Sequence, residues 1–106
     1  MVDCAHGATY RVSPTVLREL GAEVVALNVA PDGLNINATC GSLFPEVVQQ
    51  AVVAEGANVG FTHDGDGDRL LCADERGGLA DGDQILALCA LDMLAEGRLP
   101  SRTVVA

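Results

Sequence analysis

The part of this sequence with the clearest chemistry is the acidic run DGDGDR at residues 64–69, which directly follows an apolar segment. Three carboxylates stand at alternate positions, and the glycines between them permit the tight backbone conformations that would turn all three inward. Crowded carboxylates raise one another's pKa, so a cation is needed to keep them ionised at neutral pH. Oxygen ligands favour a hard ion, Mg²⁺ first and Mn²⁺ or Ca²⁺ next, over Zn²⁺. We therefore predict a Mg²⁺ site formed by Asp64, Asp66 and Asp68.

Arg69 ends this run and places a fixed positive charge beside the carboxylates. A divalent metal and a guanidinium together bind phosphoryl oxygens well, because both are positive and the guanidinium donates parallel hydrogen bonds. We therefore expect a phosphate to approach the metal, with Arg69 as a catalytic residue. The alternative is that Arg69 only forms salt bridges with its aspartate neighbours.

Two other structures would explain the acidic run. Asp and Gly are common turn residues, so the run could be a solvated turn. It could also be the calcium loop of an EF-hand, in which D-x-D-x-D-G is followed by Glu at position twelve. Glu75 stands at the twelfth position, but Arg69 occupies the sixth, where glycine is required. Strands rather than helices are also expected on both sides, so the EF-hand is disfavoured.

The elements that must position this run alternate along the chain. Short apolar and β-branched runs predict strands, whereas apolar residues spaced by three and four predict helices. Strands are expected at residues 1–5, 22–29, 57–62 and 70–73. Helices are expected at residues 12–20 and 43–52, and a third is expected from an Asp81 or Asp83 cap to Gly97.

This order predicts a three-layer α/β/α fold with a mixed four-stranded sheet. Parallel neighbours need a crossover of about a dozen residues, which the two helical segments provide. The third and fourth strands are joined by only about six residues, so the fourth is expected to be an antiparallel edge strand. The acidic run then lies at the carboxyl end of the sheet.

Charge and composition exclude some functions. Six basic residues against fifteen acidic ones give a net charge of −9, which repels polyanions, so we expect no nucleic-acid partner. No apolar run approaches the roughly 18 residues of a membrane span, and the N-terminus is not typical of a signal peptide. We therefore expect no membrane partner and a cytoplasmic location. The four cysteines form no CxxC pair, and we expect buried free thiols, with Cys40, which stands in a loop, as the exception.

Three further polar residues stand near the expected strand ends. Asp3 lies inside the first strand, where a buried carboxylate needs hydrogen-bond donors, so we expect backbone or hydroxyl groups to satisfy it. His6 precedes a glycine and is expected to form hydrogen bonds near the start of the first helix. His63 directly precedes the acidic run, where it would either orient a carboxylate ligand or simply pack.

Four segments taken in order resemble a known family. DCAHGATYRVSPTVLRELGAEV, then PDGLNIN with CGS a few residues on, then DGDGDR, then DGDQIL resemble the second domain of the phosphoglucosamine mutases, in the α-D-phosphohexomutase superfamily. The resemblance covers essentially all 106 residues. DGDGDR is typical of the whole superfamily, whereas the segment 31–42 favours the glucosamine branch over the phosphomannose and phosphoglucose branches.

The resemblance implies one domain of a four-domain enzyme that interconverts glucosamine 6-phosphate and glucosamine 1-phosphate, on the route to the bacterial cell wall. Asp64, Asp66 and Asp68 match the family's Mg²⁺ ligands, and a phosphoserine oxygen from the first domain would be the fourth. Arg69 matches an arginine near the phosphoryl-transfer site. Residues 1–101 would form this domain and residues 102–106 would begin the next element. Because the serine and the substrate loops belong to the remaining domains, we expect the isolated chain to be inactive.

Three alternatives stay open from the sequence. The chain could come from another phosphohexomutase, a phosphomannomutase or phosphoglucomutase. It could be a free-standing module that binds a divalent metal and regulates a partner, or a remnant that folds without function. Both ends of the chain fall inside expected strands, and elements are seldom left unfinished at natural chain ends. We therefore expect a piece of a longer enzyme.

Overall fold

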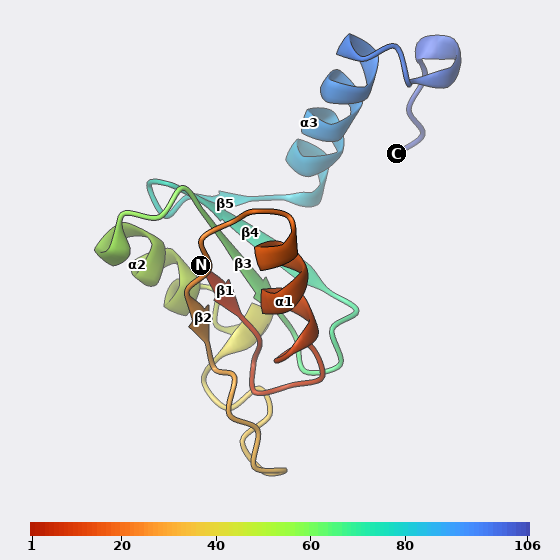
Figure 1. The fold of residues 1–106 in the computed structure, drawn as a ribbon. Coiled ribbons are helices and arrows are strands. Elements are labelled where there is room, and N and C mark those ends of the chain that lie inside the picture. Colours follow the sequence, from red (N-terminus) through yellow and green to blue (C-terminus); the bar gives the residue numbers. More distant parts are fainter.

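A five-stranded sheet in the order β2-β1-β3-β4-β5 forms the centre of the structure, a computed structural model that describes all residues from 1 to 106 (Figure 1). The strands are β1 (Val2–Asp3), β2 (Ala26–Leu27), β3 (Val59–His63), β4 (Leu70–Asp74) and β5 (Leu79–Ala80). The helices are α1 (Val12–Glu19), α2 (Glu46–Glu55) and α3 (Gly82–Ala95), with short 3₁₀ helices η1 (Gly41–Leu43) and η2 (Pro100–Arg102). Strand β1 pairs in parallel with β2 and β3, and β3, β4 and β5 pair antiparallel.

Helices α1 and α2 lie on opposite faces of this sheet. On β3, Gly60 faces α2, because a Cβ placed on Gly60 would lie 2.5 Å from Cγ2 of Val52. His63 faces α1, where its Nε2 lies 2.8 Å from Oγ of Ser13. These two residues of β3 are an odd number of positions apart, and successive side chains of a strand alternate between faces. The α/β class, the mixed sheet and the layered arrangement are therefore confirmed.

The predicted number of strands was wrong, because β4 is not the edge strand. The turn expected at residues 75–78 is present, and Oδ1 of Asp74 accepts hydrogen bonds from the N–H groups of Arg76, at 2.9 Å, and Gly78, at 2.6 Å. This tight turn returns the chain along β4, where Leu79 pairs with Ala73. The added strand β5 has two residues, which is too short for an alternating pattern to be visible in the sequence.

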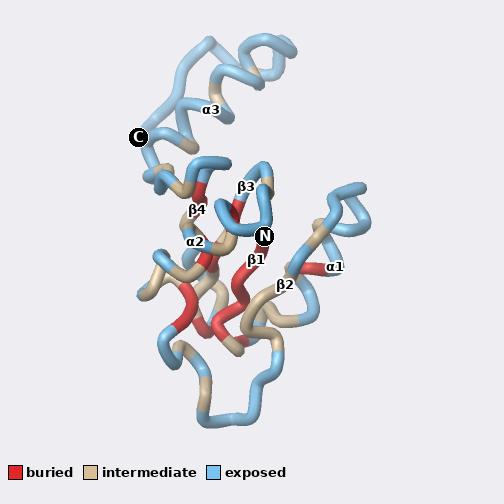
Figure 2. The backbone as a smooth tube through the Cα atoms, turned by 90° about the vertical axis from the view of Figure 1, so that its left-hand side faces the viewer, coloured by how far each residue is buried: buried red, intermediate tan, exposed pale blue.

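The main hydrophobic core lies between the sheet and α2. Buried side chains of Met1, Val48, Val52 and Ala73 form one cluster, and the buried parts of the backbone in Figure 2 follow β1, β3, β4 and α2. Gly60 is the residue that lets α2 come this close, since a side chain there would meet the Cγ2 atoms of both valines. The core therefore depends on a small residue in the middle of β3.

Helix α3 projects away from the sheet (Figures 1 and 2). Its start is fixed by a capping box in which Oδ1 of Asp81 accepts the Gln84 N–H and Oε1 of Gln84 accepts the Asp81 N–H. Of the two predicted caps, Asp81 and Asp83, the structure therefore uses Asp81. The helix buries none of its residues, and Leu88 and Leu91 are each 65% exposed.

No helix here has the length and the apolar character that a membrane span requires. Of residues 102–106, expected to begin a further strand, Arg102 ends η2 and residues 103–106 belong to no helix or strand, and the domain boundary at residue 101 stays a prediction.

We expect Gly60→Ala to destabilise the protein by about 1–3 kcal/mol, because the added methyl group overpacks the contact between β3 and α2. The free energy of unfolding in urea measures this effect. Gly82→Ala is the matched control, since a Cβ at Gly82 would meet no atom within 4 Å. A Gly60→Ala protein as stable as the control would contradict the packing described.

Candidate metal centre

The acidic run forms the loop between β3 and β4, at the carboxyl end of β3. One carboxylate oxygen from each of Asp64, Asp66 and Asp68 lies within 4.8 Å of the others. The side chain of Asp64 is 16% exposed, whereas that of Asp68 is 70% exposed. The structure thus brings the three predicted ligands together, with one carboxylate at the base of the loop and the others on its open side.

Hydrogen bonds inside the loop hold this arrangement. The backbone O of Asp64 accepts the N–H of Gly67 at 3.2 Å, and Oδ1 of Asp64 accepts the N–H of Arg69 at 3.1 Å. Gly67 has a φ of +77°, in the left-handed region that favours glycine. Asp64 therefore organises the turn through its backbone and its side chain, which leaves its second oxygen free of backbone partners.

The loop rests on two other segments, residues 5–9 and residues 36–41. The O atom of Gly65 accepts the Ala8 N–H at 2.8 Å, and a Cβ on Gly7 would lie 2.2 Å from that same oxygen. On its other side, a Cβ on Gly65 would lie 2.6 Å from Cδ1 of Ile36. Any side chain at Gly7 or Gly65 would push the loop away, so both glycines are needed for the close backbone approach.

The three carboxylates affect one another's ionisation. The pKa of Asp68 is raised by its hydrogen bond to Asp64 and then by the negative charges of Asp66 and Asp64. Desolvation opposes ionisation of Asp64, but hydrogen bonds from the Arg69 N–H and from Asp68 outweigh it and lower the pKa of Asp64. One carboxyl group of the cluster thus holds a proton more readily, and a cation would balance the negative charge of its neighbours. The oxygen donor set and its crowding therefore fit a hard divalent cation.

Arg69 contacts the carboxylates only loosely. Its Nε lies 3.8 Å from Oδ2 of Asp64 and 3.9 Å from Oδ1 of Asp68, and its side chain is 74% exposed. Exposed ion pairs of this length contribute little to stability. The salt bridges given as the alternative role of Arg69 are thus present, but most of the guanidinium remains available to an anion on the open side of the loop.

The histidines take structural roles in this arrangement. His63 contacts Ser13 of α1, a partner that the sequence did not indicate, and burial lowers the pKa of His63. This contact ties α1 to the residue before Asp64, and packing is therefore the better interpretation of His63. Nδ1 of His6 accepts the Ala30 N–H at 3.2 Å, which joins two loops rather than starting a helix.

All four cysteines are free, but the expected exception was wrong. Cys40 is buried although it stands in a loop, because that loop packs beneath the sheet end next to Asp3. Cys89 is exposed, because α3 covers nothing and is covered by nothing. Desolvation raises the pKa of the Cys4, Cys40 and Cys72 thiols, which makes them poor nucleophiles.

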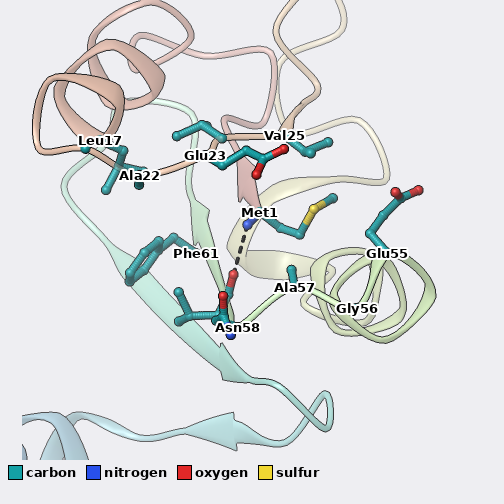
Figure 3. A pocket seen from close by; sticks show the side chains of 13 residues that line it. Met1, Leu17, Ala22, Glu23, Val25, Glu55, Gly56, Ala57, Asn58 and Phe61 are labelled. Carbon is teal, nitrogen blue, oxygen red and sulfur yellow. Dashed lines mark hydrogen bonds between the residues drawn. The ribbon is translucent and has the colours of Figure 1, made fainter.

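A cavity of about 530 Å³ lies at the other end of the sheet (Figure 3). Most of the residues that line it are apolar, among them Met1, Ala57 and Phe61, and Glu23 and Glu55 also line it. The amino group of Met1 donates to the Val59 O at 2.9 Å within it. None of the three aspartates lines this cavity, so the cavity is separate from the candidate metal centre.

Comparison with known proteins shows which family this chain resembles. A family model described as phosphoglucomutase/phosphomannomutase, alpha/beta/alpha domain II, matches residues 1–78. A phosphoglucosamine mutase from Symbiobacterium thermophilum is 66% identical over 105 residues, which is 99% of this chain and 24% of that protein. A phosphoglucosamine mutase from Heliobacterium modesticaldum is 58% identical over 104 residues, 98% of this chain and 23% of that protein.

A solved structure also matches. The crystal structure of a phosphoglucomutase/phosphomannomutase family protein from Burkholderia thailandensis aligns with a TM-score of 0.76 at 31% identity, over 91% of this chain and 22% of that one. The chain thus spans about a quarter of the length of the curated relatives it matches. Since the family model covers most of the chain, this chain belongs to the phosphoglucomutase/phosphomannomutase family, as its second α/β/α domain.

Proposed function

We propose that this chain is the metal-binding domain of a phosphoglucosamine mutase, an intramolecular phosphotransferase that interconverts glucosamine 6-phosphate and glucosamine 1-phosphate. The observation that carries the proposal is the convergence of Asp64, Asp66 and Asp68 within 4.8 Å at the end of β3, with Arg69 beside them. The relatives named phosphoglucosamine mutase, one of them 66% identical, support the choice of sugar. A cytoplasmic location and a part in supplying peptidoglycan precursors belong to the same proposal.

Asp64, Asp66 and Asp68 are the residues that would hold Mg²⁺. Bound there, the ion would neutralise charge on a transferring phosphoryl group. The chain contributes the position of these carboxylates: Asp64 is fixed by the Arg69 N–H, and Asp66 and Asp68 face solvent on the open side of the loop. The open side is where a phosphoserine from another domain would approach.

Arg69 would bind a phosphoryl oxygen on that open side. Its guanidinium is largely exposed and only loosely paired with Asp64 and Asp68, so an anion can take its hydrogen bonds without breaking a buried contact. We assign the nucleophile to neither Ser13, which lies in α1, nor Ser42, which lies in η1, because neither belongs to the acidic run. The proposal therefore assigns the phosphoserine and the sugar-selecting loops to the rest of the enzyme, and predicts no turnover by these 106 residues alone.

We expect the chain to bind Mg²⁺ with a dissociation constant on the order of 10⁻³ M, because three carboxylates without a phosphoserine leave the remaining ligand positions to water. Isothermal calorimetry measures this affinity, and Asp66→Asn should abolish it. Asp74→Asn is the matched control, since Asp74 also lies in the β3–β4–β5 region but binds only the turn amides. Equal Mg²⁺ binding by the Asp66→Asn and Asp74→Asn proteins would contradict the assigned site.

In the full-length enzyme, we expect Arg69→Gln to lower kcat/KM at least about tenfold, since a hydrogen bond to a charged group contributes roughly 1.5–3 kcal/mol. Steady-state assay of glucosamine 1-phosphate formation checks this. Arg76→Gln removes another largely exposed guanidinium, from the β4–β5 turn, and should leave the rate unchanged. If the two variants had the same rate, Arg69 would have no part in phosphate binding.

A further inference from the structure

Asp3 is a fully buried carboxylate that is not one of the three converging aspartates. Its Oδ1 accepts the Ala5 N–H at 2.9 Å, and its Oδ2 accepts the Gly41 N–H at 3.0 Å. Hydrogen bonds to an ionised acceptor are about twice as strong as neutral ones. Both oxygens are occupied by backbone groups, one local and one 38 residues away in the chain. The carboxylate therefore joins two loops at the carboxyl end of the sheet.

The first of these loops begins in an unfavourable backbone conformation. Ala5 and His6 have φ values of 53° and 49°, in the left-handed region that residues with a side chain seldom adopt. The hydrogen bond from the Ala5 N–H to Asp3 supports this turn. The turn places Gly7 and Ala8 against the acidic loop, where the Ala8 N–H donates to the Gly65 O at 2.8 Å.

The second loop meets the same site from the other side. A Cβ on Gly41 would lie 2.7 Å from the backbone O of His63, so the residue that Asp3 holds rests against the residue before Asp64. The Asn37 N–H donates to the Ala5 O at 2.9 Å, which connects the two loops directly. Asn37 also packs against Gly65, since a Cβ on Gly65 would lie 2.7 Å from Nδ2 of Asn37.

We propose that Asp3 is a positioning residue for the metal loop. Asp3 holds Ala5 and Gly41 by hydrogen bonds, and their two segments contact His63 and Gly65. In this way it fixes the spacing of the three carboxylates of the acidic loop. Loss of this hold would let the acidic loop relax toward wider spacing of its like charges, with lower affinity for a cation. The inference rests on the proposed metal-binding function.

The test is Mg²⁺ affinity in Asp3→Asn, whose amide keeps the shape of the side chain but can accept from only one of the two N–H groups. We expect its Mg²⁺ dissociation constant to rise at least fivefold, measured by calorimetry where the variant is folded. Val52→Ala is the matched control, because it weakens the core against α2 without touching either loop. Affinity within twofold of the original in both variants would overturn the proposal.

A metal-free readout separates this proposal from the function on which it rests. In amide hydrogen exchange without metal, Asp3→Asn should speed exchange of the Ala8 N–H at least tenfold more than that of the Gly78 N–H, which Asp74 holds at the far end of β4. Equal acceleration of both would mean that Asp3 acts only on global stability, and would overturn the positioning role. If the original chain bound no Mg²⁺, the metal-binding function would fail, and this exchange result would still decide the role of Asp3.

The original chain provides a second measurement in case Asp3→Asn does not fold. If the hold on Gly41 favours metal binding, metal binding must favour that hold by the same factor, because coupling between two equilibria is reciprocal. Saturating Mg²⁺ should therefore slow exchange of the Gly41 N–H and leave that of the Gly78 N–H unchanged. No slowing at Gly41 in a chain that binds Mg²⁺ would overturn the proposal.

Discussion

Mutual repulsion among Asp64, Asp66 and Asp68 is the constraint on which the rest of this structure depends. Three like charges within 4.8 Å favour separation, so the chain must hold them together by other means. It does so with the Gly67 turn, the Arg69 backbone N–H and two loops that contact the acidic loop through glycine. A cation that enters this arrangement gains favourable interactions without having to assemble its ligands.

The face of the sheet under α2 and the carboxyl end of the sheet are held in different ways. Under α2, apolar side chains make the contact, with Val48 and Val52 packed over Gly60. At the carboxyl end, where the acidic loop lies, hydrogen bonds to Asp3 and between backbone groups join the loops. The apolar contact holds the sheet and helix together, while the hydrogen bonds hold the loops that carry the polar groups.

The sequence was sufficient for features whose causes are local. Asp64, Asp66 and Asp68 lie close along the chain, so their convergence followed from alternation and intervening glycines, and the alternating strands and helices fixed the layers. Features that depend on contacts between residues far apart in the sequence could not be predicted from it. The two residues of β5 carry no pattern, the burial of Cys40 depends on how its loop folds under the sheet, and nothing near Asp3 indicates that Gly41 would be its partner.

The central claim is that a divalent ion binds at the acidic loop and not diffusely over an acidic surface. Titration with Mn²⁺, which broadens NMR signals of nearby nuclei, tests it most directly. We expect the amide signals of residues 64–69 to broaden first, followed by that of Ala8, whose N–H contacts the loop. Broadening that appears equally at the exposed carboxylates of α3 and its end, Asp92 and Glu96, would contradict it.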